Sequence, residues 1–198
     1  MKLFQLVLLI TILTSLQALA QDTPETRPTV QDLDFYIGTW EISFQIFDTH
    51  NPNQEALFTE KGTQICEYDL SYRGVPQFII CKGELVCDSG RYVGRTRSFQ
   101  EAIRYGRFEN SYERVGIYSN WPATGLELLR YDSAEAKFVI KGELKVQDHM
   151  LERYEDVYQF NEDYTTYTRR NVANFSDMPI TEYNLTLTGT GRKVKSKD

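Results

Sequence analysis

The stretch DFYIGTWEISFQIF, residues 34–47, determines how the rest of the chain is interpreted. From Trp40 onward, apolar residues occupy every second position and polar residues lie between them. This period of two is typical of a β-strand with one buried face. We therefore predict a strand over residues 38–47 that places the Trp40 side chain in a core.

Similar alternation recurs along the chain, and no segment shows the 3.6-residue stripe of an amphipathic helix. We expect about nine or ten strands joined mainly by short turns, with a second strand at residues 59–72 and a closing strand at residues 180–192. A sheet of this size tends to close, which removes its exposed edges. Serial hairpins favour an up-and-down barrel over a Greek-key sandwich. The predicted fold is all-β, an antiparallel up-and-down barrel of about 8–10 strands.

The triplet Gly38-Thr39-Trp40 resembles the Gly-x-Trp motif of lipocalin-like (calycin) β-barrels, and residues 34–41 resemble the opening of secreted bacterial lipocalin-like proteins of unknown function. The resemblance covers residues 34–192 in outline and implies a small-molecule binding role. It also implies that Trp40 closes one end of the barrel beneath an arginine near the end of the last strand. In this sequence that arginine would be Arg192, stacked on the indole ring.

The chain ends are expected to lie outside the barrel domain, residues 34–192. Lys2, an apolar run at residues 3–13 and the small-residue end at Ala20 are typical of a secretory signal peptide. We expect cleavage near Ala20 and a secreted or periplasmic protein, without a transmembrane segment because the apolar run is too short. Residues 21–33 are predicted to form a flexible leader that packs at most through Val30 and Leu33, and residues 193–198 a charged tail.

The formal net charge of −6 disfavours nucleic acid as a partner, because its phosphates attract basic surfaces. One group of arginines runs against this balance. We interpret it as a solvated strand face, since charged residues are mostly exposed. The group comprises Arg91, Arg95, Arg97, Arg104 and Arg107.

Of the three cysteines, Cys66 and Cys81 can be paired by geometry. A two-residue turn centred on Arg73 and Gly74 places them opposite each other in a hairpin, with Cα atoms about 5.5 Å apart. A disulfide fits this separation and an oxidising compartment. The alternative is three buried thiols, Cys87 included, that act as small apolar side chains.

The chain contains thirteen tyrosines, and five of them are assigned to inward faces. A tyrosine has an apolar ring with a polar tip, which suits a partly polar cavity for a small hydrophobic or amphipathic molecule. The alternative is that the rings fill the barrel and bond to one another. The five candidate ligand-binding residues are Tyr68, Tyr72, Tyr92, Tyr154 and Tyr158.

The sequence contains no Gly-x-Ser-x-Gly, His-Glu-x-x-His or phosphate-binding glycine loop, so no catalytic residue is assigned. The acidic group Glu152, Glu155 and Asp156 is interpreted as ion-paired with neighbouring arginines. An enzyme remains a second alternative. Its sign would be inward Glu152 or Asp156 beside a tyrosine with a perturbed pKa.

Metal and haem binding lack sufficient ligands in the sequence. Of the two histidines, His50 lies in a predicted loop and His149 in a predicted turn, and the nearby Asp48 and Asp148 offer each of them one second metal ligand. A structural metal site usually needs four ligands. The resemblance includes haem-binding barrels, but haem needs a strong axial ligand, so no cofactor is assigned and tyrosine ligation stays an alternative.

We therefore predict a non-catalytic, secreted or periplasmic protein that binds a small, partly apolar molecule. The first alternative is a filled barrel that docks onto a cell-envelope partner through residues 119–124 and 171–179. An exposed Trp121 or Phe175 would favour it, because aromatic anchors dominate interfaces. The sequence predicts neither the identity of the ligand nor an oligomeric state.

Overall fold

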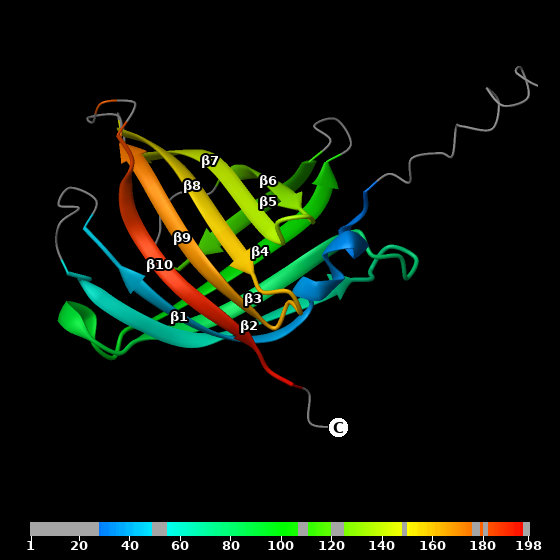
Figure 1. Ribbon diagram of the computed structural model, residues 1–198, viewed down its shortest axis with the longest axis horizontal. Coiled ribbons are helices and arrows are strands. Elements are labelled where there is room, and N and C mark those ends of the chain that lie inside the picture. The colour runs from blue at the N-terminus through cyan, green and yellow to red at the C-terminus, as the bar shows by residue number, and fades with distance from the viewer. Residues whose placement is uncertain are drawn as a thin grey trace, which may run out of the picture.

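The computed structural model describes residues 28–48, 55–106, 111–119, 125–147, 150–175, 179 and 182–195, with backbone alone for residues 144–147, 150 and 151. In this part of the chain, ten antiparallel strands form a closed barrel, as Figure 1 shows. The strands are β1 (Gly38–Ile46), β2 (Phe58–Asp69), β3 (Phe78–Cys87), β4 (Thr96–Gly106), β5 (Ser111–Tyr118), β6 (Leu126–Asp132), β7 (Lys137–Gln147), β8 (Met150–Phe160), β9 (Thr166–Phe175) and β10 (Asn184–Lys193).

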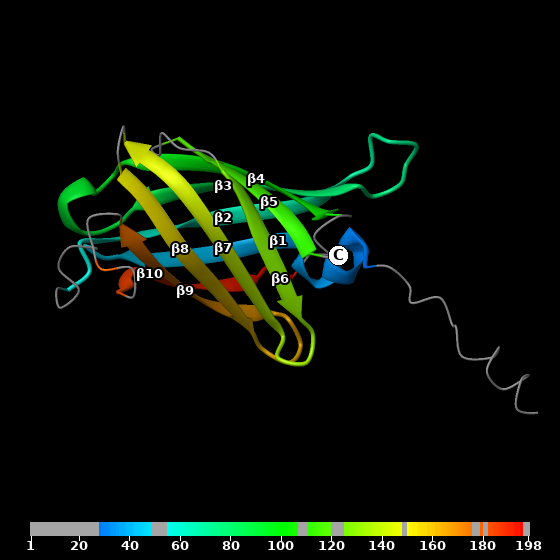
Figure 2. The ribbon, with the colours of Figure 1, turned by 90° about the horizontal axis from the view of Figure 1, so that it is seen from above.

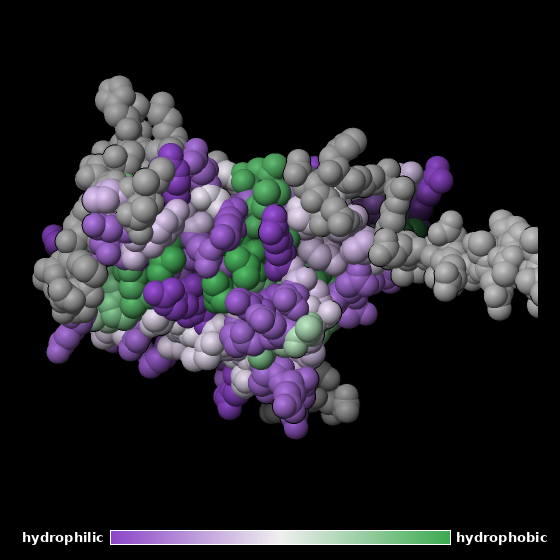
Figure 3. All heavy atoms as spheres, turned by 45° about the horizontal axis from the view of Figure 1, so that its top comes forward, coloured by the Kyte–Doolittle hydropathy of each residue, from purple (hydrophilic) through white to green (hydrophobic). Residues whose placement is uncertain are grey.

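Each strand pairs with the next in sequence, and β10 closes the barrel against β1. This up-and-down order confirms the predicted fold class and is compatible with a lipocalin-like barrel. On the face shown in Figure 3, hydrophilic residues are interleaved with hydrophobic ones. Closure pairs the strand edges and encloses an interior.

Part of the predicted docking segment 171–179, expected to be a loop, belongs to a strand. Residues 171–175 continue β9, and Asn174 donates its side-chain amide to the carbonyl oxygens of Pro179 and Glu182, at 2.8 and 2.7 Å. Asparagine and alanine are poor strand formers, so their presence in this run masked the strand. The second strand is shorter than predicted, because β2 ends at Asp69 rather than at residue 72.

A short 3-10 helix, η1 (Val30–Tyr36), packs on one end of the barrel (Figure 1). The second 3-10 helix, η2 (Gly90–Tyr92), lies at the other end (Figures 1 and 2). The start of η1 is capped by Thr29, whose hydroxyl accepts the Gln31 amide at 3.2 Å. Val30 and Leu33 are buried, as predicted, but they lie in an ordered helix rather than a flexible leader. A seven-residue helix is too short to show a helical period in the sequence.

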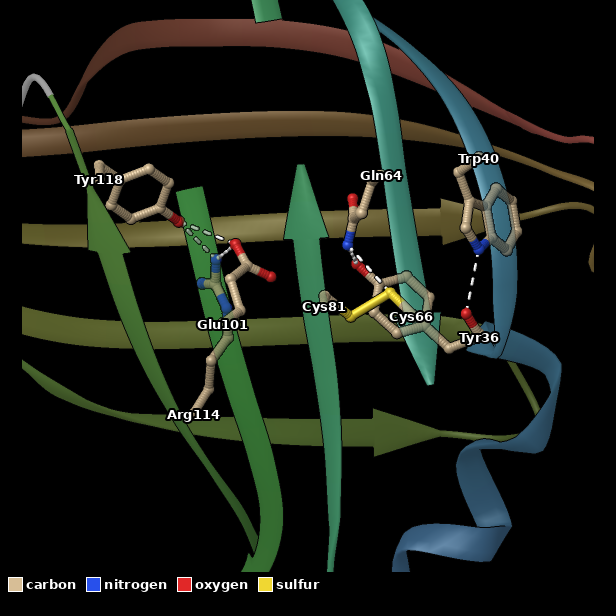
Figure 4. The surroundings of a disulfide bond; sticks show 8 residues. All are labelled: Tyr36, Trp40, Gln64, Cys66, Cys81, Glu101, Arg114 and Tyr118. Atoms are coloured by element: carbon tan, nitrogen blue, oxygen red, sulfur yellow. Dashed lines mark hydrogen bonds and ion pairs between the residues drawn. A yellow bond between two sulfur atoms is a disulfide. The ribbon is translucent and has the colours of Figure 1, made fainter. Parts of the chain in front are cut away.

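Trp40 closes the barrel beneath η1. Its side chain is fully buried, and its indole N–H donates to the Tyr36 carbonyl at 3.0 Å (Figure 4). The ring packs against Tyr167 and Phe160, with centroids 5.2 and 6.3 Å away. These contacts fix η1 against the first strand and fill this end of the interior.

The prediction that Arg192 covers the Trp40 ring is wrong. The Arg192 side chain is 73% exposed and pairs with Glu41 on the outer surface. The β1–β10 register places Lys193 opposite Trp40, and residues directly opposite each other in a sheet share a face. The Lys193 ammonium therefore lies 5.6 Å from the centre of the indole ring and donates to the Phe35 carbonyl at 2.9 Å.

Four inward glycines let large aromatic rings lie flat inside the barrel. Each glycine is directly opposite an aromatic residue on the neighbouring strand, in the pairs Gly83–Phe99, Gly142–Tyr154, Gly189–Phe44 and Gly191–Tyr167. A Cβ added at Gly189 would lie 2.1 Å from the Phe44 ring, and one at Gly191 would lie 2.2 Å from Tyr167. The glycines thus provide the space that the rings occupy.

The predicted disulfide between Cys66 and Cys81 is present (Figure 4). The turn is centred on Arg73 and Gly74, which have φ angles of 55° and 70° as a type I′ turn requires. The Cα atoms of the two cysteines are 4.0 Å apart, nearer the spacing of a non-hydrogen-bonded pair than the 5.5 Å expected. The third cysteine, Cys87, is a buried free thiol.

Replacing Trp40 by alanine should lower the free energy of unfolding by about 3 to 5 kcal/mol, because it removes a fully buried aromatic side chain. Denaturant titration measures this change. The control is Ile117→Ala on β5, where the side chain is 58% exposed and the expected change is within about 0.5 kcal/mol. Equal midpoints for the Trp40 variant and the parent would contradict the role of Trp40.

Thiol alkylation in denaturant tests the disulfide. Without reductant, one cysteine, Cys87, should react, and after reduction all three should react. Mass spectrometry counts the added groups. Three modified cysteines without reductant, in protein purified from its natural compartment, would show that the bond does not form.

Candidate functional site

The barrel encloses a cavity of about 350 Å³ at the end away from η1. Its lining comes from the last residues of β1, such as Ile46, and the first residues of β2, β8 and β10, such as Phe58, Glu152 and Leu187. Because β1 starts at the η1 end, these positions lie at the far end. A volume of this size is within the range of small-molecule pockets.

The lining combines apolar and charged side chains. The apolar set is Phe44, Ile46, Phe58, Leu85, Phe99 and Leu187, and the charged set is Glu60, Arg97, Glu101, Arg114, Glu127, Glu152, Asp156 and Arg169. The alternative of a fully filled barrel holds only for the η1 end. There the interior is occupied by a cluster of Tyr36, Trp40, Phe138, Tyr158, Phe160 and Tyr167.

Arg169 separates the aromatic cluster from the cavity. Its guanidinium lies 5.0 Å from the centre of the Phe44 ring and 4.9 Å from that of Tyr158. It makes a bidentate pair with the buried Asp156, donating at 3.0 Å from Nε and 2.6 Å from Nη2. Burial alone would lower the pKa of Arg169, but the Asp156 carboxylate raises it well above its usual value. Arg169 is therefore charged.

Arg114 is shared between two carboxylates. Its Nη2 donates to Glu101, and its Nη1 donates to Glu127 at 2.7 Å. Burial alone would raise the pKa of Glu101, but Arg114 outweighs burial and holds this pKa below its usual value. For Glu127, burial prevails and raises the pKa, although Tyr154 donates a hydrogen bond to it. One cation thus compensates two buried acids only in part.

The predicted arginine face is divided between the interior and the surface. Arg97 points inward and pairs with the buried Glu60 at 2.6 Å, which contradicts its assignment to a solvated face. Arg104 lies outside and pairs with Glu113. Arg91 and Arg95 stack on Tyr92, at 5.6 and 4.9 Å from the ring centre. Arg107 lies outside the described residues.

Glu152 differs from the other acids of the cavity. It is 9% exposed, and no hydrogen bond or ion pair joins its carboxylate to any residue in the described part of the chain. Burial raises its pKa to about 7. The predicted pairing with an arginine is correct for Asp156, which pairs with Arg169, and wrong for Glu152. Glu155 is ion-paired, but with Lys141 rather than an arginine.

Arg153 is next to Glu152 in the sequence, but its guanidinium cannot pair with the Glu152 carboxylate. Successive residues of a strand point to opposite faces, so Arg153 lies outside and donates to Glu143 at 2.9 Å. The described lining holds five carboxylates and three guanidiniums, with no lysine. The cavity therefore carries surplus negative charge when Glu152 is ionised.

Of the five predicted tyrosines, Tyr154 alone lines the cavity. Tyr158 is buried in the aromatic cluster, and Tyr68 is partly buried against the core, with no hydrogen-bond partner for its hydroxyl among the described residues. Tyr72 is 59% exposed, because β2 ends at Asp69 and the alternation stops there. Tyr92 lies in η2 and packs edge-on against Phe58, 5.3 Å between ring centres.

The paired charges of the cavity were missed in the sequence. One usable signal is an acid flanked at both second neighbours by apolar residues, as Glu101 is by Phe99 and Ile103. Such a residue lies on the buried face of a strand and needs a partner there. The identity of that partner, Arg114, follows only from the pairing of β4 with β5.

Several predictions fall outside the described residues, namely those on His50, His149 and Trp121. Phe175 is 8% exposed and packs in the core, so it does not provide the exposed anchor of the docking alternative. Among the described residues, no three His, Cys, Asp or Glu side chains are grouped to hold a metal ion. Within the same residues, no helix has the length and apolar character to cross a membrane.

No protein-family model matches the chain, and no curated protein matches it. The function of the site is therefore inferred from its own geometry.

Glu152 should make stability depend on pH. Its pKa is about 7 when folded and near 4.5 when exposed, so between these values the unfolded chain loses the proton first and the free energy of unfolding falls as pH rises. Glu152→Gln removes this contribution. In denaturant titrations from about pH 4 to pH 8, the free energy of unfolding of the variant should rise relative to that of the parent by about 3 kcal/mol at most. A stability difference between the two proteins that does not change with pH would contradict the burial of an unpaired Glu152.

Proposed function

We propose that this protein binds a small amphipathic molecule inside the barrel and acts as a non-catalytic carrier. The observation that carries the proposal is the cavity of about 350 Å³, closed at one end by Trp40 and the aromatic cluster. Its apolar side chains would bury the body of a ligand, and its charged side chains would orient a polar group.

The ion pairs of the cavity support binding rather than mere packing. Arg97, Arg114 and Arg169 are each held by at least one carboxylate, so the polar surface is arranged before any ligand enters. Preorganised groups lose little freedom on binding, which favours affinity. A solidly filled barrel would need no such open polar surface.

The cellular location forms part of the proposal. A signal-like start at residues 1–20 directs the chain out of the cytoplasm, and the Cys66–Cys81 disulfide is typical of an oxidising compartment. A secreted or periplasmic carrier is consistent with both features.

An enzyme is the second candidate, because Glu152 points into the cavity with a raised pKa and burial raises the pKa of Tyr154 well above its usual value. Such perturbed groups are frequent in active sites. Acid–base catalysis requires a second group within reach of the same reacting atoms. Glu152 has no described hydrogen-bond partner, and the Tyr154 hydroxyl donates to Glu127. Binding is therefore the function that the geometry supports better.

Titration with N-phenyl-1-naphthylamine, a neutral aromatic probe that becomes fluorescent in apolar surroundings, tests the carrier function. We expect saturable binding by the parent and about tenfold weaker binding by Leu187→Trp, whose larger side chain would occupy the cavity. The matched control is Thr190→Trp, on the exposed side of the same strand. Absence of saturable binding, or equal affinity in both tryptophan variants, would contradict the proposal.

A further inference from the structure

We propose that the ligand of the cavity carries a protonated amine, which pairs with the Glu152 carboxylate while its apolar body contacts the lining. This inference rests on the proposed carrier function and specifies the chemical class of the ligand. It is drawn from the distribution of charge among the lining residues.

The guanidiniums of the cavity already have carboxylate partners. Arg97 donates to Glu60 from Nε and Nη2, and Arg169 donates to Asp156 through the same two groups. Arg114 directs one terminal nitrogen to each of two acids and a further hydrogen bond to the Tyr118 hydroxyl at 2.8 Å. An anionic ligand would have to compete with these pairs for its cation.

Glu152 is in the opposite situation. The residue is 9% exposed, its side chain lines the cavity, and its carboxylate has no hydrogen-bond or ion-pair partner among the described residues. An ionised carboxylate accepts hydrogen bonds and donates none, so its complement is an N–H or O–H donor. A buried charge without a partner is costly, and a cation placed beside it removes that cost.

The surplus charge distinguishes an amine from a neutral donor. With five carboxylates and three guanidiniums in the described lining, a single positive charge brings the cavity nearer to neutrality. A hydroxyl group could donate to Glu152, but a charge-assisted hydrogen bond is roughly twice as strong as a neutral one. The apolar side chains of the same lining, Ile46 and Leu187 among them, suit an alkyl or aromatic body.

Isothermal titration with three ligands of one chain length separates these possibilities. The ligands are n-octylamine, 1-octanol and octanoate, measured with the full mature protein at about pH 8, where Glu152 is ionised and the amine is protonated. We expect octylamine to bind about tenfold or more tightly than octanol, as one charge-assisted hydrogen bond provides, and octanoate to bind most weakly.

The variant Glu152→Gln keeps the size of the side chain and removes its charge. It should abolish the preference for octylamine and leave the affinity for octanol within about twofold. The control Glu155→Gln removes a carboxylate from the outer face of the same strand and should keep the preference. Equal affinities for amine and alcohol, tightest binding of octanoate, or an unchanged preference in Glu152→Gln would overturn the inference and leave the carrier function standing. If neither octylamine nor octanol binds, and the naphthylamine probe does not bind either, both the amine inference and the carrier function are overturned.

Discussion

The packing of Trp40 beneath η1 is the contact on which the remaining structure depends. The indole ring is fully buried and hydrogen-bonded to the Tyr36 carbonyl, so the first strand and the helix that precedes it form one closed end. Phe160 and Tyr167 extend this contact around the barrel. Because the aromatic cluster fills the η1 end of the interior, the cavity lined by Glu152 and Tyr154 lies at the other end.

The interior beyond the cluster is shaped by the requirement that buried charges be compensated. Arg169, stacked between Phe44 and Tyr158, meets this requirement through Asp156 and forms the boundary of the cavity. Arg114 meets it only partly, because it serves two acids. Glu152 does not meet it among the described residues, and a buried acceptor left open in a cavity is what a binding site offers before its ligand arrives. The stability of the barrel and its proposed selectivity thus arise from one distribution of charge.

The fold could be predicted from the sequence because period-two patterns and turn residues are local. The turn at Arg73 and Gly74 alone sets the register that joins Cys66 to Cys81. The site depends on relations between distant strands. Arg192 and Lys193 are adjacent in sequence, yet the β1–β10 register directs only Lys193 to Trp40. Likewise, Arg114 reaches Glu101 and Glu127 because β5 lies between β4 and β6, and no pattern within one strand encodes such a triad.

The measurement that tests the carrier function most directly is the mass of the mature protein, purified from its natural compartment, under native and denaturing conditions. A carrier should show an added mass in the native spectrum that disappears on denaturation, and Leu187→Trp, purified in the same way, should show less of it. That added mass would also give the composition of the ligand, including whether it contains nitrogen. A native mass equal to that of the bare chain, in protein that has never met detergent or organic solvent, would contradict the conclusion that the cavity carries a ligand.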